Sequence, residues 1–279
     1  MAAPAPALRI RALTLMDVLD ESFRIYRANF PVLGALAILL AIPLLAVQLL
    51  SGTTTVISSY YSAVVNATGP PTSITGVNPL VGALQYPVQL ALLPFTVATL
   101  FAAAVAIVLG RPVTVWSALR NVLRRYWTLW ALSFLFSLSS VALCCPPVGV
   151  WLLVKLSMLF PVVFTEEASL GTTLERSWRL TDRAFWRIFA VLLLALLLAY
   201  IVESALAAVF VATATLFPGL PIQVRVFLIV AVASLMVQLV QPLLTIAVTL
   251  LYFDLRVRRE AFDLEVMAYQ LSLPKGAAS

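Results

Sequence analysis

Almost all of the basic residues in this chain fall into four groups, and long uncharged apolar runs separate the groups. The members are Arg9, Arg11, Arg24, Arg27; Arg111, Arg120, Arg124, Arg125; Arg176, Arg179, Arg183, Arg187; and Arg256, Arg258, Arg259, Lys275. A charged side chain at the centre of a bilayer costs about 2.5–3.5 kcal/mol on insertion scales, so the uncharged runs can cross a membrane and the groups cannot. The pattern predicts an integral membrane protein.

The composition agrees with this class. Of the 279 residues, 62% are hydrophobic and 11% are charged, whereas a soluble domain carries about 25% charged residues. The formal net charge of +6 does not indicate nucleic-acid binding, because the basic residues flank apolar spans and do not line a polar face. We therefore expect no nucleic-acid partner.

A membrane-spanning helix needs about 20 apolar residues, and the apolar runs predict six such helices in an all-α fold. We place them at approximately 30–50, 83–109, 127–145, 148–165, 188–214 and 226–253, within one membrane domain over residues 1–265. Residues 266–279 are expected to form a flexible cytoplasmic tail. The run 127–165 is interrupted by Cys145, Pro146 and Pro147, which predicts two short spans joined by a tight turn. A re-entrant hairpin is the alternative.

The basic groups also predict an orientation. With six spans all four groups lie on one side, whereas the connections at 51–79, 146–147 and 216–221 contain no Lys or Arg. Cytoplasmic connections are enriched in Lys and Arg, so we expect both termini in the cytoplasm. The excess of Arg over Lys is typical of a GC-rich bacterial genome, which predicts the bacterial inner membrane.

Three segments on the predicted cytoplasmic side align without a gap: Thr14–Tyr26, Thr114–Tyr126 and Ser169–Thr181. Each opens with Ser or Thr, the preferred N-cap residues, and has Leu at the sixth place. Each also has a large apolar residue at the tenth place and Arg at the eleventh. This spacing predicts three amphipathic interfacial helices, each ahead of a helical hairpin. Their shared arginines, Arg24, Arg124 and Arg179, are candidate contacts to lipid headgroups; the alternative is that the helices only anchor the hairpins.

Three charges lie within or at the outer edge of the predicted spans: Lys155, Glu203 and Arg225. We expect Lys155 near the middle of the fourth span and Glu203 nearer the outer face. A structural charge pair of Glu203 with Lys155 or with Arg225 is the first interpretation. A transport site and a contact to lipid headgroups are the alternatives.

The sequence predicts no catalytic, cofactor or metal site. Without histidine there is no Ser-His-Asp or Cys-His arrangement, and the adjacent Cys144 and Cys145 cannot form a zinc site alone. Glu166 and Glu167 are expected to be solvated at a membrane border. The segment after the last span, in which Asp254 and Arg258 form an i,i+4 pair, is expected to be a solvated helix.

Three blocks resemble a known family, the membrane domain attached to some bacterial glycerophosphodiester phosphodiesterases and also found alone. The blocks are Asp17–Phe30, Ser177–Arg187 and Tyr252–Glu265. The catalytic domain of that family is absent here, and its histidines have no counterpart. The resemblance therefore implies a stand-alone membrane module and no phosphodiesterase activity.

These observations predict a non-catalytic accessory or scaffold protein that contacts membrane lipids or partner proteins. The small residues Ala102, Ala106 and Gly110 are spaced by four and would allow close helix packing within one chain or in a homo-oligomer. The alternative function is a small-solute transporter that uses Lys155, Glu203 and Arg225.

Overall fold

The computed structural model describes residues 14–50, 59, 79–182, 184–215 and 219–260, and these residues form helices without any strand. Six of the described helical segments are long and apolar enough to cross a membrane, which confirms the predicted all-α class and the six candidate spans. The predicted loop at 51–79 and the tail at 266–279 lie almost entirely outside the described residues.

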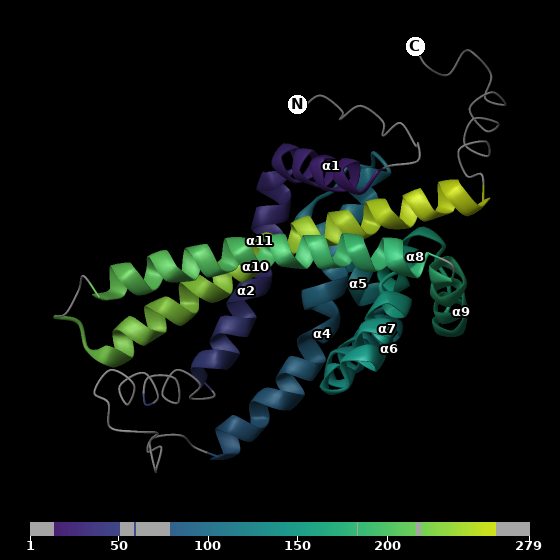
Figure 1. The fold of residues 1–279 in the computed structure, drawn as a ribbon. Coiled ribbons are helices and arrows are strands. Elements are labelled where there is room, and N and C mark those ends of the chain that lie inside the picture. Colours follow the sequence, from purple (N-terminus) through teal and green to yellow (C-terminus); the bar gives the residue numbers. More distant parts are fainter. Residues whose placement is uncertain (1–13, 51–58, 60–78, 183, 216–218, 261–279) are drawn as a thin grey trace.

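Figure 1 shows the arrangement of the helices. The elements are α1 (Leu15–Ala28), α2 (Phe30–Leu50), α4 (Pro79–Val108), α5 (Val115–Arg124), α6 (Tyr126–Val141), η1 (Ala142–Cys144), α7 (Pro146–Leu156), α8 (Leu159–Thr165), α9 (Leu170–Thr181), α10 (Phe185–Thr215) and α11 (Ile222–Glu260).

Short helices begin directly after the three Ser or Thr residues that open the aligned segments. Thr14 and Thr114 each form a capping box, in which the hydroxyl accepts from the backbone N–H three residues on and that residue's side chain accepts from the cap N–H. Such boxes satisfy two of the backbone donors that every helix leaves unpaired at its start. Ser169 makes no side-chain capping bond to the backbone; its hydroxyl lies 2.9 Å from that of Thr172.

The longest helix, α11, is the central element of the packing. It lies against α10 along much of its length and also contacts α1, α2, α4 and α8. In Figure 1 the pair α10 and α11 runs across α2 and α4. The largest buried cluster joins these helices and includes Leu33, Leu100, Ile246 and Tyr252.

Burial is concentrated at one end of the long helices. On α11 the buried side chains lie between Pro242 and Leu255, and no described side chain from Pro221 to Gln241 is buried. On α10 none of the described side chains after Ala199 is buried. The arginine-rich connections lie at the same end, where α1, α5 and α9 join the long helices; we call it the charged end. The helix pairs pack tightly at the charged end and expose apolar side chains beyond it.

The hairpin of α6, η1 and α7 depends on one close approach. A β-carbon placed on Gly149 would lie 2.5 Å from the backbone nitrogen of Leu143 and 2.7 Å from the carbonyl carbon of Ala142. Only glycine fits there without a backbone shift. Pro146 at the first position of α7 suits a helix start, because its missing N–H would have no partner there.

We expect Gly149→Ala to lower the free energy of unfolding by about 1–3 kcal/mol, the usual cost of inserting a methyl group into a packed site. The measurement is the thermal unfolding midpoint of the purified protein in one detergent. Gly171→Ala is the matched control: its β-carbon meets no atom within 4 Å, so that substitution should leave the midpoint unchanged or raise it. A Gly149→Ala protein as stable as the control would contradict the close approach.

Candidate functional site

The fourth candidate span is interrupted between α7 and α8. Pro161 has no N–H to donate to the carbonyl of Ser157, and its ring clashes with that carbonyl; the helix is broken at Ser157 and Met158. By contrast, Pro43, Pro94 and Pro242 lie inside unbroken helices. A broken helix leaves the last carbonyls of its first half without helical partners.

Lys155, near the end of α7, contacts α9 and its C-cap residue Asp182 through its backbone carbonyl and its ammonium group. The carbonyl of Lys155 accepts a hydrogen bond of 2.7 Å from the Ser177 hydroxyl, which satisfies an acceptor that the break has freed. The ammonium of Lys155 pairs with the Asp182 carboxylate and lies 5.3 Å from the centre of the Trp178 ring. The Lys155 side chain is 7% exposed and that of Asp182 is 58% exposed. A buried lysine thus reaches a carboxylate at the surface.

This pairing corrects the predicted partner of Lys155. Asp182 lies just before α10, whereas Glu203 lies 18 residues after the first residue of α10, about 27 Å along the helix. Lys155 therefore sits at the charged end and not in a group with Glu203. The sequence predicts one helix over residues 148–165. It contains no signal that this helix is broken or that α9 packs against the break.

The other two members of that predicted group are Glu203 and Arg225. The side chain of Glu203 lies outside the described residues. Arg225 is half-buried near the start of α11, and its Nε has no hydrogen-bond partner among the described residues. The structure does not bring these residues together with Lys155.

A second polar cluster joins the α8–α9 connection to α11. Arg176 donates from Nε to both oxygens of Glu166, at 3.0 and 3.1 Å. The hydroxyl of the fully buried Tyr252 donates to the same carboxylate at 2.9 Å. Glu166 was expected to be solvated, and this expectation is wrong because the packing of α11 brings Tyr252 against it. Its neighbour Glu167 is 81% exposed and pairs with Arg125.

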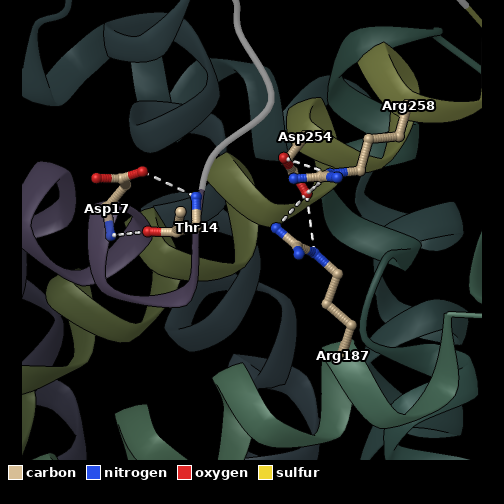
Figure 2. A network of polar contacts seen from close by, with 5 residues as sticks. All are labelled: Thr14, Asp17, Arg187, Asp254 and Arg258. Carbon is tan, nitrogen blue, oxygen red and sulfur yellow. Dashed lines mark hydrogen bonds and ion pairs between the residues drawn. The ribbon is translucent and has the colours of Figure 1, made fainter.

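A third cluster surrounds a carboxylate with no exposed surface. Asp254 accepts from Arg187 Nη2 at 2.9 Å and from Arg258 Nε at 3.0 Å, and Figure 2 shows both guanidinium groups converging on it. The i,i+4 pair of Asp254 with Arg258 is present as predicted. The expectation of a solvated helix is wrong at Asp254, because α10 supplies Arg187 and covers the carboxylate. Burying a charge requires such partners.

The repeated arginines Arg24, Arg124 and Arg179 all lie exposed on the charged end, and the structure gives them different surroundings. Arg24 pairs with Glu21 in the same helix. The backbone carbonyl of Arg179 accepts a bond of 2.9 Å from Arg259 Nη1. The Arg124 side chain has neither an ion pair nor a hydrogen bond among the described residues.

The three small residues spaced by four differ in burial. Ala102 on α4 is 5% exposed and Ala106 is half-buried, whereas Gly110 lies after the end of α4 and is exposed. Their part in a homo-oligomer stays a prediction. Cys144 and Cys145 are free and exposed at the α6–α7 turn. The described residues contain no group of three or more His, Cys, Asp or Glu that could hold a metal ion.

The first short helix is attached to α11 by a tyrosine. The Tyr26 hydroxyl donates to the carbonyl of Leu239 at 2.7 Å, and its ring makes an edge contact with Phe30. Partial burial raises the pKa of Tyr26 above its ordinary value of 10.0, because desolvation disfavours the phenolate.

Four of the residues that build these clusters, Tyr252, Asp254, Asp182 and Glu166, were not predicted as site residues. One feature of the sequence points to Asp254 as a site residue. It is the first charged residue after the long uncharged run that follows Arg225. The partners could not be read from the sequence, because Arg187 and Tyr252 lie 67 and 86 residues from the groups that they bind.

Comparisons with protein-family models, with curated proteins and with solved structures find no match for this chain. The resemblance to a phosphodiesterase-linked membrane domain therefore stays a prediction, and the clusters at the charged end must be interpreted from their own chemistry.

We expect Asp254→Asn to lower the free energy of unfolding by about 2–3 kcal/mol. Loss of one partner from a buried ion pair costs about 3–5 kcal/mol, and the value here is reduced because Arg187 and Arg258 are 27% and 40% exposed. Thermal or denaturant unfolding in detergent measures the change. Glu175→Gln removes the same charge at an exposed site on α9 and should change stability little. If the two substitutions lowered the free energy of unfolding equally, the buried ion pairs of Asp254 would not contribute the stability expected of them.

Tyr26→Phe should cost about 1 kcal/mol near neutral pH, the net value of one hydrogen bond. A raised pKa in the folded protein means that the folded state holds this proton more tightly than the unfolded state. The contribution is therefore complete below pH 10 and is lost as the pH rises through the folded pKa. The stability difference between wild type and Tyr26→Phe should shrink above pH 10. A difference that stays constant or grows there would contradict the raised pKa of Tyr26.

Proposed function

We propose that this protein is a non-catalytic membrane module whose charged end faces the cytoplasm and rests in the lipid headgroup layer. In this proposal α1, α5 and α9 form a collar of interfacial helices. Each of them precedes one helical hairpin of a threefold repeat. Lipid headgroups are the primary partner, and the module acts as an accessory or scaffold within the bacterial inner membrane.

One repeated observation carries the proposal. Each short helix is followed by a long helix, and an exposed aromatic side chain lies at the first or second residue of that long helix. These side chains are Phe30 on α2, Trp127 on α6 and Trp186 on α10. Their exposed fractions are 48%, 78% and 77%. Tryptophan is enriched at membrane–water interfaces, where its ring meets lipid and its N–H meets water. Phe30 has no polar edge and supplies apolar surface only.

The buried faces of the short helices support the same assignment. α1 buries Val18, Ser22 and Ile25, and α5 buries Ala118 and Val122. Their opposite faces expose large apolar side chains, Met16 at 66% and Trp116 at 68%. A membrane–water interface solvates both apolar and charged groups, so helices that expose both kinds of side chain suit it.

The transporter alternative depended on a charge site formed by Lys155, Glu203 and Arg225. Because Lys155 pairs with Asp182 at the charged end, no described contact favours that alternative, and we do not propose it. The salt bridges at the charged end are instead explained by their role in holding α9, α10 and α11 together.

Tryptophan fluorescence in vesicles tests the proposal. Phosphatidylcholine brominated near the headgroup should quench the protein more strongly than phosphatidylcholine brominated deep in the acyl chains, and Trp127→Phe/Trp186→Phe should lose much of this shallow quenching. Trp130→Phe is the control, because the Trp130 indole donates to the carbonyl of Leu90 on α4. Stronger quenching by deep bromines, or shallow quenching unchanged in the double variant, would contradict an interfacial collar.

A further inference from the structure

The three short helices differ in their charge. α1 contains Asp17, Asp20 and Glu21 against Arg24 and Arg27, a sum of three negative and two positive charges. α9 contains one acid, Glu175, against two arginines. α5 contains two arginines and no acid, and no Asp or Glu occurs anywhere from Arg111 to Thr165. α5 is thus the only one of the three whose charges are all positive.

The exposed side of α5 combines these positive charges with apolar and aromatic groups. We call this set the α5 stripe: Trp116, Arg120, Leu123, Arg124 and, in the first turn of α6, Trp127. Within α5 the spacing of three to four residues places Trp116, Arg120 and Leu123 or Arg124 on neighbouring turns of one face. The opposite side is fixed, because Ala118 and Val122 are buried and α5 packs along α4.

Two arginines of the stripe, Arg120 and Arg124, have no acidic partner among the residues that the structure describes. The next arginine in sequence, Arg125, pairs with Glu167 at 2.8 Å. Arg24, the counterpart of Arg124 in α1, has its partner Glu21. Within the described part of the chain, the α5 stripe is therefore a cationic surface without a counter-charge.

We propose that the α5 stripe binds the headgroup of an anionic phospholipid; this inference rests on the proposed interfacial collar and names its ligand. Charge complementarity selects an anion, because a guanidinium can donate two parallel hydrogen bonds to a phosphate group. The flanking Trp116, Leu123 and Trp127 require an apolar phase beside that anion. A phospholipid with net negative charge supplies both, whereas free phosphate supplies only the anion and phosphatidylcholine has no net charge.

The test uses the full chain in a neutral detergent and measures the shift of the thermal unfolding midpoint on titration with lipid. Phosphatidylglycerol and phosphatidylcholine with the same acyl chains are compared, and inorganic phosphate forms a third arm. We expect wild type to respond more strongly to phosphatidylglycerol than to phosphatidylcholine, with no response to inorganic phosphate. Arg120→Gln/Arg124→Gln should lose at least half of the preference for phosphatidylglycerol.

The matched control is Arg27→Gln/Arg111→Gln, which removes two exposed positive charges from positions outside the α5 stripe and should keep the preference. Equal losses in the two double variants would overturn the assignment to α5, and so would a preference that neither variant changes. A response to inorganic phosphate equal to that for phosphatidylglycerol would overturn the choice of a lipid. A negative result in the bromine-quenching experiment would instead contradict the interfacial collar. The collar and the lipid site on α5 are therefore tested by different observations.

Discussion

The contact of Asp254 with two guanidinium groups is the interaction on which the charged end depends. Its carboxylate has no exposed surface, and a buried charge is tolerated only where partners replace the lost hydration. Arg187 comes from the start of α10 and Arg258 from the end of α11, so the pair of helices is fixed in register at this end. Two further contacts, Lys155 with Asp182 and Tyr252 with Glu166, attach α9 and its connection to the same assembly. The polar contacts thus lie where the helices converge.

Away from these contacts the helices expose apolar side chains, and this division follows from the bilayer as a solvent. Hydrocarbon is as apolar as leucine, so lipid gives separated helices no hydrophobic reason to associate. Polar contacts and close packing of small residues must then hold them, and both are found at the charged end: the buried alanines of α4 lie in the same cluster as Tyr252 and Leu255. Beyond it, side chains such as Leu197 and Ile201 on α10 are about half exposed, as expected for a surface that meets lipid.

The long helices could be predicted from the sequence because the physics is local: an uncharged apolar run of sufficient length is enough. The starts of α1 and α5 could also be predicted, since Thr14 and Thr114 cap their own helices through residues three positions away. The clusters could not. The position of Lys155 depended on a break caused by Pro161 and on the packing of α9, and the burial of Asp254 depended on Arg187, 67 residues earlier. Periodicity gives the face of a helix but does not identify the helix that will cover it. The headgroup contacts of Arg24, Arg124 and Arg179 and the family resemblance stay predictions.

The central claim is that the three short helices share one side of the membrane, opposite the turn between α10 and α11. Site-directed cysteine labelling tests it most directly, in a background in which Cys144 and Cys145 are replaced by serine. Asn121→Cys on α5, Glu175→Cys on α9 and Gly219→Cys at that turn are all exposed positions. A membrane-impermeant maleimide applied to intact cells should label only Gly219→Cys, and applied to inverted membrane vesicles it should label only Asn121→Cys and Glu175→Cys. Labelling of Gly219→Cys from the same side as the other two would contradict the account.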